Sequence, residues 1–413
     1  MTTKSFPNNN DQKMFFFRSP AFILFWISSL LSNIGTWMQQ VAQPWLVLTL
    51  TNSPLWVGID SFAMNAPVWI FTLWGGYLAD MFDRKKTILV FQAIQFVCVL
   101  TMVLLLWLGW LRVGIIVFLS FIVGLTESLS MPSFQTIIPS IVDKAEIPRA
   151  VSLNSMQFNL SRILGPSIAA IVIVKFGALV CFGANAISFL PFFISVYLIY
   201  PKYRIGAKER LDSNLPAKKS FKALIQAFRQ LVQNPDVSFP LLAIFVNGLF
   251  CSPIITFCSV VIKNWFQSEV GNYGGAMAAF GIGGLLSAAL IAMKTPKWFQ
   301  SKKSISIVSI LMGIILLLIA YNRSYYLLII LLTSIGALLT GLNISINSYL
   351  QTTSTEAERG KTSSLYQLAL AGGMSLGALL TAFTIDRFSV LNALLINATV
   401  IISFHLFRLT SRN

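Results

Sequence analysis

Long apolar runs recur along the 413-residue chain and constrain its fold more than any other feature. Residues 23–31, 97–108 and 305–321 each lie within about 20 largely uncharged residues, the length of helix that crosses a hydrocarbon core of about 30 Å. Only 11% of the residues are charged and 56% are hydrophobic, whereas soluble domains carry roughly 25% charged residues. A segment in lipid must satisfy its own backbone hydrogen bonds, so these runs predict membrane-spanning helices.

We expect an all-α membrane protein with twelve transmembrane helices in two six-helix bundles. The expected spans are residues 20–49, 54–79, 87–110, 113–138, 149–174, 177–200, 237–264, 271–293, 303–321, 324–352, 362–385 and 388–408. A long polar stretch separates the sixth span from the seventh. It divides the chain into a cytoplasmic N-terminal tail (1–18), an N-terminal bundle (19–200), a cytoplasmic linker (201–236) and a C-terminal bundle with a short cytoplasmic tail (237–413).

The distribution of basic residues predicts the orientation of these spans. The net charge is +16, but the basic residues lie between the apolar runs and form no single patch with interleaved aromatics, so nucleic-acid binding is not indicated. Of the 30 Lys and Arg residues, 24 fall on the side that holds both termini and five on the other, with Arg162 inside a span. Lys and Arg in short loops stay on the cytoplasmic side, so both termini are expected in the cytoplasm.

The loop between the second and third spans carries a recognisable motif. Residues 75–86 read GGYLADMFDRKK, a glycine followed four residues later by an aspartate and then by a basic cluster. This resembles the signature loop of the major facilitator superfamily, with Met81 where a basic residue is usual. The resemblance implies a latch that holds the N-terminal half against the eleventh span, and the alternative is an ordinary basic loop. The expected cytoplasmic gate comprises Gly76, Asp80, Asp83, Arg84, Lys85 and Arg359.

The fifth span and three longer stretches narrow the resemblance. Gly165-Pro166 resembles a motif of exporters in the drug–proton antiport branches, where proline kinks the helix, although such a pair also occurs for packing alone. Residues 35–43, 139–166 and 351–361 resemble the bacterial subgroup that contains the enterobactin exporter and related siderophore and drug efflux carriers. The resemblance implies a transporter of the bacterial inner membrane that exports a small organic molecule by alternating access, driven by protons.

Few ionisable groups fall inside the spans, where a charge costs several kcal/mol unless it is paired or hydrated. Glu127 and Arg162 each lie roughly 20 Å from the end of their span at about 1.5 Å per residue, so they would pair near the midplane if spans four and five are neighbours. Either Glu127 carries a proton or binds substrate, with Arg162 assisting it or holding an anionic substrate, or the two form a static ion pair. Asp60 is expected near the periplasmic mouth, as a second proton site or a solvated residue.

Amide side chains supply the remaining polar groups of the spans. Each one alone is interpreted as a hydrogen bond between helices, whereas the set fits a hydrated cavity. Trp45, Trp56, Trp69 and Trp74 are candidates for stacking on a ring-bearing substrate or for interfacial anchoring. The expected cavity-lining residues are Asn33, Gln39, Gln43, Asn154, Asn159, Asn247, Asn343, Asn347 and Gln367.

Three other functions compete with export. The same fold could take up a metal–siderophore complex or another small solute, or act in general multidrug efflux, because fold does not fix direction or substrate. A membrane-embedded enzyme would need clustered His, Asp or Glu, but the single histidine, His405, is interpreted as a packing residue. The four cysteines lie in apolar runs without metal-ligand spacing. We therefore expect a non-enzymatic monomer without cofactor or metal, whose partners are a small-molecule substrate, protons and the lipid bilayer.

Overall fold

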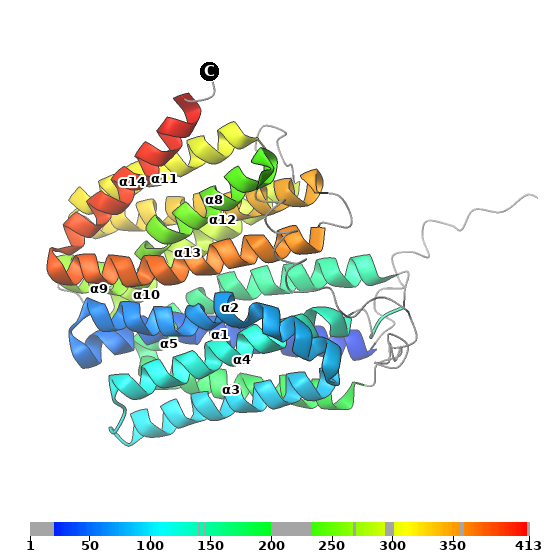
Figure 1. Ribbon diagram of the computed structural model, residues 1–413. Helices are drawn as coiled ribbons and strands as arrows, with labels where there is room; N and C mark the ends of the chain where they lie inside the picture. The colour runs from blue at the N-terminus through cyan, green and yellow to red at the C-terminus, as the bar shows by residue number, and fades with distance from the viewer. Residues whose placement is uncertain are drawn as a thin grey trace, which may run out of the picture.

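The computed structural model describes residues 20–138, 141–143, 146–199, 233–266, 270–293, 301–354 and 359–410, and every regular element in these ranges is a helix (Figure 1). Figure 1 shows α1 to α5 on one side of the molecule and α8 and α11 to α14 on the other. The helices are α1 (Pro20–Thr51), α2 (Pro54–Met81), α3 (Arg84–Trp107), α4 (Val113–Ile137), α5 (Ile147–Leu198), α8 (Pro235–Phe250), α9 (Pro253–Phe266), α10 (Val270–Met293), α11 (Lys302–Tyr321), α12 (Tyr325–Thr353), α13 (Arg359–Arg387) and α14 (Val390–Thr410).

Within the described ranges, ten helices are long and apolar enough to cross a membrane. The ten include residues 149–198 as a single helix and do not include α2. The prediction of two helical bundles in a membrane is confirmed, whereas the count of twelve spans and the domain boundaries stay predictions.

Helix α5 contains two of the expected spans. It is 52 residues long, and at Gly177 the backbone has φ 81° and ψ 173°, a conformation open essentially only to glycine. Trp26 of α1 donates to the carbonyl oxygen of Leu153 over 2.9 Å, and Ser28 of α1 donates to the hydroxyl of Ser195 over 2.7 Å. Residues from both sides of Gly177 therefore contact the same turn of α1, so α5 folds back on itself at this glycine.

The expected seventh span is interrupted after α8. The amide groups of Cys251 and Ser252 both donate to the carbonyl oxygen of Asn247, over 2.8 and 3.0 Å, and α9 begins at the next residue. That residue is Pro253, which has no N–H group to continue the helical hydrogen bonds. The chain therefore crosses in two shorter helices, α8 and α9, where the apolar run alone predicted one.

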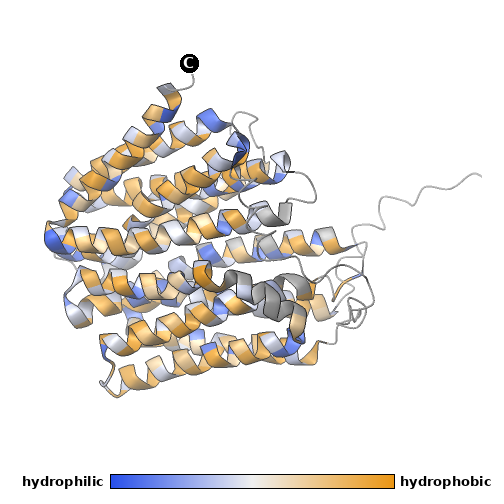
Figure 2. Ribbon diagram, in the orientation of Figure 1, coloured by the Kyte–Doolittle hydropathy of each residue, from blue (hydrophilic) through white to orange (hydrophobic). Residues whose placement is uncertain are grey.

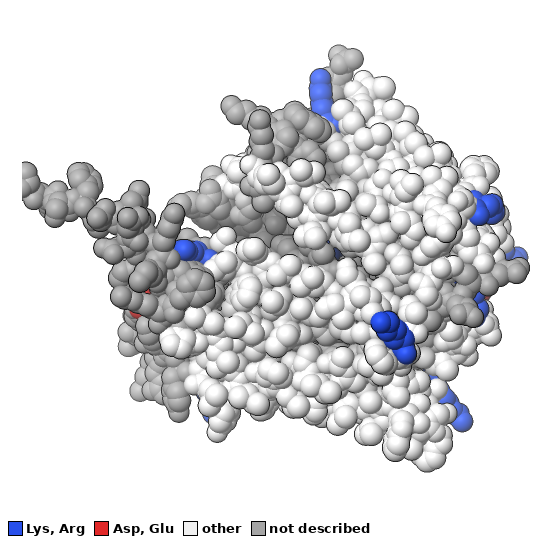
Figure 3. All heavy atoms as spheres, turned by 180° about the vertical axis from the view of Figure 1, so that it is seen from behind, with Lys and Arg blue, Asp and Glu red and all other residues white. Residues whose placement is uncertain are grey.

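The outer surface is apolar over most of its area. Figure 2 shows hydrophobic residues along the length of almost every helix, and Figure 3 shows one broad face on which Lys and Arg are few and widely separated. Large side chains on this surface include Trp107, Leu290, Ile330 and Phe383, each more than 60% exposed. Continuous apolar surface of this kind is stable in contact with lipid tails rather than water.

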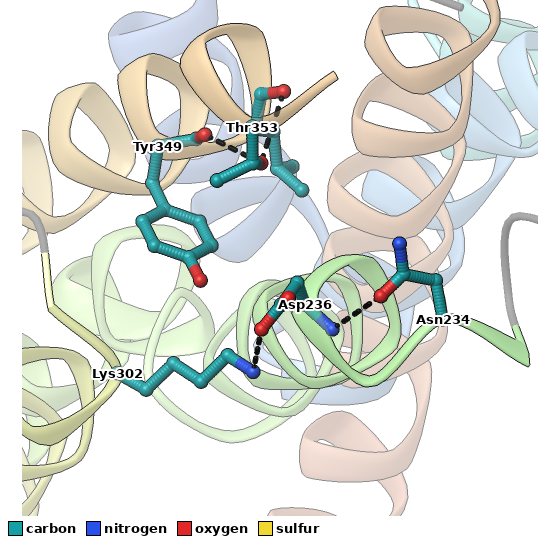
Figure 4. A network of polar contacts seen from close by, with 6 residues as sticks. Asn234, Asp236, Lys302, Tyr349 and Thr353 are labelled. Atoms are coloured by element: carbon teal, nitrogen blue, oxygen red, sulfur yellow. Dashed lines mark hydrogen bonds and ion pairs between the residues drawn. The ribbon is translucent and has the colours of Figure 1, made fainter. Parts of the chain in front are cut away.

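Polar contacts show which helix termini share one end of the molecule. The side chain of Asn234 caps α8 by accepting from the amide of Asp236 over 2.9 Å, and the Asp236 carboxylate pairs with Lys302 at the start of α11 (Figure 4). Figure 4 also shows Tyr349, near the end of α12, beside this pair. The starts of α8 and α11 and the end of α12 therefore lie together, as expected for the cytoplasmic side.

The two bundles meet along two pairs of helices. Helix α2 of the first bundle packs against α13 of the second, and α5 packs against α10. The α5–α10 contact is close because Gly274 has no side chain: a Cβ there would lie 2.8 Å from the carbonyl oxygen of Ala170. These interfaces place α2 and α5 of the first bundle at the boundary with the second.

Candidate functional site

A buried network of polar side chains surrounds Asp60. The amide nitrogen Nε2 of Gln43 in α1 donates to Oδ2 of Asp60 in α2 over 2.7 Å, and the Ser120 hydroxyl in α4 donates to Oδ1 over 2.6 Å. The same Gln43 nitrogen lies 2.8 Å from the Ser120 oxygen. Asp60 is only 5% exposed, so of its two expected roles the solvated residue does not fit the structure, whereas the buried proton site stays a prediction.

The network continues from Gln43 to another part of the first bundle. Gln39 donates to Oε1 of Gln43 over 3.1 Å, and Asn185 of α5 donates to Oε1 of Gln39 over 2.6 Å. Gln39 and Gln43 are 8% and 5% exposed, so they join helices instead of lining an open cavity. Ser120 and Asn185 are partners that the sequence interpretation missed, because an isolated Ser or Asn in an apolar run carries no signal of the face on which it lies.

Arg162 lies halfway along the first leg of α5, against an aromatic ring. Its guanidinium carbon lies 5.4 Å from the centroid of the Trp37 ring in α1. The close contact between α5 and α1 depends on Gly165, because a Cβ there would lie 2.3 Å from the Cβ of Trp37. The helix continues through Pro166 with helical backbone angles, and its recorded break lies at Gly177. Arg162 is half-buried and lies within electrostatic reach of Tyr366 in α13 of the other bundle.

Glu127 and Arg162 form no ion pair in the structure. Helix α4 packs on α2 and α3, whereas α5 packs on α1, α3 and α10, so the two helices are not close neighbours. Gly124 places α4 tightly on α2, because a Cβ there would lie 1.9 Å from the carbonyl oxygen of Met64. Glu127 is half-buried, like Arg162, and neither has a charged partner within ion-pair distance among the described residues.

The other expected cavity residues separate into different environments. Asn247 in α8 is fully buried and donates to Ser309 of α11 over 2.9 Å, with the ring nitrogen Nε2 of His405 in α14 at 3.5 Å. It therefore joins helices within the second bundle, and His405 packs there as expected. Asn343 is 8% exposed. Asn33 and Asn154 are half-buried, whereas Asn347 and Gln367 are exposed.

The expected cytoplasmic gate is described only in part. The surroundings of Gly76 and the side chains of Asp80, Arg359 and, in the expected cavity, Asn159 lie outside what the structure describes. Asp83 caps helix α3: its Oδ1 accepts from the amide of Lys86 over 2.9 Å. The Lys85 ammonium donates to the carbonyl oxygen of Tyr197 over 2.5 Å, and Arg84 occupies the first position of α3. Asp83 thus has a local role as a helix cap, a position that aspartate favours.

Several contacts join the two bundles between the middle of α1 and the α1–α2 turn. The Tyr273 hydroxyl of α10 donates to the carbonyl oxygen of Val41 in α1 over 2.7 Å, and the Tyr273 ring stacks on Trp45 with 5.2 Å between centroids. Lys263 of α9 donates to Oδ1 of Asn52 over 2.6 Å. The half of the molecule that is predicted to face the periplasm is therefore tied across the interface.

The part of the chain that the structure describes contains no set of side chains arranged to bind a metal ion. No three His, Cys, Asp or Glu side chains gather there in an arrangement that could hold a metal ion. The groups available are amides, single carboxylates, one guanidinium and aromatic rings, which can bind an organic molecule and exchange protons with it or with water.

Known proteins with similar sequences are membrane transporters. The staphyloferrin A transporter of Staphylococcus aureus is 26% identical over 371 residues, covering 89% of this chain and 90% of that protein. The multidrug efflux pump Tap of Mycobacterium tuberculosis is 24% identical over 378 residues, covering 88% and 86%. The enterobactin exporter EntS of Salmonella typhi is 23% identical over 278 residues, covering 65% and 63%.

A solved structure and a family assignment complete the comparison. The nucleoside transporter NupG matches with a TM-score of 0.71 and 14% identity over 95% of this chain and all of that one, which supports the major facilitator fold. Residues 13–412 match the family described as transmembrane secretion effector. Since the match covers nearly the whole sequence, this multi-pass bacterial membrane protein belongs to the transmembrane secretion effector family of major facilitator transporters, and is a transporter rather than an enzyme.

Proposed function

We propose that this transporter is a proton-coupled secondary exporter of a siderophore or a similar small amphiphilic compound. It works as a monomer in the bacterial inner membrane, with both termini in the cytoplasm. Transport follows alternating access, in which the two bundles rock about a site between them. The named relatives transport staphyloferrin A, enterobactin or drugs, and these names support the substrate class.

The observation that carries the proposal is that two ionisable residues, Glu127 and Arg162, are half-buried without an ion-pair partner among the described residues. An ionisable residue at membrane depth is costly unless water or a partner reaches it, and such residues mark substrate and ion pathways. Glu127 is assigned the exchange of protons. Asp60 is the second choice, because its two carboxylate oxygens already accept hydrogen bonds from Gln43 and Ser120.

General multidrug efflux is the second candidate. It is favoured by the similarity to Tap, which extends over 378 residues, more than the similarity to the enterobactin exporter. Uptake of a metal–siderophore complex uses the same fold in the opposite direction and remains an alternative. The sequence of events at Glu127 would be the same for each substrate, so only flux measurements separate them.

Transport into everted membrane vesicles tests the proposal. A siderophore and a cationic drug are supplied outside vesicles with an imposed pH gradient, acidic inside. Accumulation of the siderophore that collapses with a protonophore supports proton-coupled export. Accumulation of the drug alone supports multidrug efflux, and uptake confined to right-side-out vesicles identifies an importer.

A further inference from the structure

Arg162 is set apart from the other basic residues by its position. Among the described helices it is the one Lys or Arg that lies more than a turn from a helix end or break, about fifteen residues from both the start of α5 and Gly177. No carboxylate of the described residues pairs with it. A guanidinium that is half-buried at membrane depth without an acidic partner is available to bind an anion.

The ring of Trp37 provides one wall beside this cation. It lies 5.4 Å from the guanidinium carbon, and it also contacts the Phe158 ring, whose centroid is 6.1 Å away in an edge-on arrangement. Gly165 holds the backbone of α5 against the base of Trp37. The indole is therefore fixed by its own bundle, and it can present apolar area to a flat molecule whose charged end meets Arg162.

The opposite bundle brings one polar residue, Tyr366, near Arg162, and Tyr366 in turn contacts the backbone of Asn343. Tyr366, within electrostatic reach of Arg162, donates to the backbone carbonyl oxygen of Asn343 over 3.3 Å. The side-chain oxygen Oδ1 of Asn343 is buried and has no hydrogen-bond partner in the described part of the chain. A buried amide oxygen without a partner favours a bound molecule that donates a hydrogen bond, such as a hydroxyl group.

We propose that Arg162 and Trp37 recognise an anionic group next to a flat ring or apolar body, so that the transported molecule is an organic anion of the carboxylate type. This specificity rests on the proposed transport function, because it names the substrate class of the same site. The substrate anion provides the counter-charge that the described residues do not provide. A neutral molecule of the same shape leaves the guanidinium unpaired and binds more weakly.

Benzoate and benzamide form a matched pair of probes, since they share a ring and differ in charge at neutral pH. The purified full-length protein in detergent is heated with each probe at millimolar concentration, and a bound ligand raises the unfolding temperature. We expect stabilisation by benzoate and little or none by benzamide. A charge-assisted hydrogen bond to the guanidinium corresponds to a difference of about 10- to 100-fold in affinity.

Two substitutions make the test specific. Arg162→Gln removes the charge and is expected to abolish the preference for benzoate, whereas Arg162→Lys retains part of it. Arg323→Gln is the matched control, because Arg323 also lies on a tryptophan, Trp265, at 4.5 Å, but on the exposed surface. It is expected to leave the preference intact.

The proposal is overturned if the wild-type protein fails to prefer benzoate, or if Arg162→Gln keeps the preference. The latter outcome would make the Arg162–Trp37 contact a purely structural link between α5 and α1. This binding test uses no membrane and no gradient. Failure of proton-driven export in vesicles would therefore leave it unaffected, and failure here would leave the vesicle result standing.

Discussion

The hydroxyl of Tyr273 in α10 donates a hydrogen bond to the backbone carbonyl oxygen of Val41 in α1, over 2.7 Å. The two residues belong to different bundles, and Tyr273 is only 1% exposed. An alternating-access transporter must separate its bundles at this end to change the side to which it opens. The hydrogen bond therefore favours the conformation that the structure shows.

Tyr273→Phe is expected to shift the conformational equilibrium toward separation at this end. The change removes one buried hydrogen bond, which contributes about 0.5–1.5 kcal/mol and corresponds to a population shift of roughly 2- to 12-fold. Distances between spin labels at the exposed positions 110 and 388, one in each bundle and both predicted to be periplasmic, measure the shift. Tyr326→Phe, at an 82% exposed tyrosine, serves as control, and equal distance distributions in both variants would contradict the assigned role.

Glu127→Gln is expected to uncouple transport from the pH gradient. Without a titratable carboxylate the protein still exchanges substrate across the membrane, but an imposed gradient no longer drives accumulation. Counterflow and gradient-driven uptake in everted vesicles measure the two activities. Asp386→Asn, at an exposed carboxylate near the end of α13, is the control. If Glu127→Gln keeps the normal pH dependence, Glu127 is not the proton carrier and the role passes to Asp60.

Substitutions in the Asp60 network are expected to lower stability in a coupled manner. Ser120→Ala and Gln43→Leu each remove a donor to the buried carboxylate, at a cost of about 1–3 kcal/mol. Because both donors serve one acceptor, the double variant should differ from the sum of the single variants by at least about 0.5 kcal/mol. Thermal unfolding in detergent measures this difference. Strict additivity would show that the contacts act independently.

Asp80→Asn is expected to leave membrane insertion and abundance intact but to reduce transport strongly, because the signature loop is predicted to latch the cytoplasmic side. Asp83→Asn is the matched control three residues away. Asp83 caps α3, and asparagine caps a helix about as well as aspartate, so transport should change little. Wild-type transport by a well-expressed Asp80→Asn protein would show that the loop does not act as a latch.

The positions of the helices could be predicted from the sequence, and so could the turn at Gly177, but the break between α8 and α9 was missed. Twenty apolar residues predict a crossing regardless of order, so the expected spans match the helices to within a few residues over most of the chain. The break between α8 and α9 at Pro253 lies inside one uninterrupted apolar run. At this break the backbone amides of Cys251 and Ser252 both donate to the carbonyl oxygen of Asn247, and the pattern of apolar residues does not reveal these hydrogen bonds.

For the candidate functional residues, the sequence predicted the depth in the membrane but not the neighbouring side chains. The sequence indicates that Glu127 and Arg162 lie far from the ends of their helices, because depth follows from residue number. Whether they pair depends on which helices are neighbours, and α4 and α5 are not. The same limit applies to Gln39 and Gln43. Their four-residue spacing puts them on one face of α1, but only packing shows that this face meets Asp60.

Helix α1 has a second face with a different part in the molecule. Trp37, Val41 and Trp45 follow one another at four-residue intervals, so they form a single stripe opposite the glutamines. One end of the stripe meets Arg162 and the other meets Tyr273. A small rotation of α1 about its axis would move both contacts together. We therefore expect ligand binding beside Trp37 and opening near Trp45 to be linked through the one helix that carries both residues, over about 12 Å along its axis.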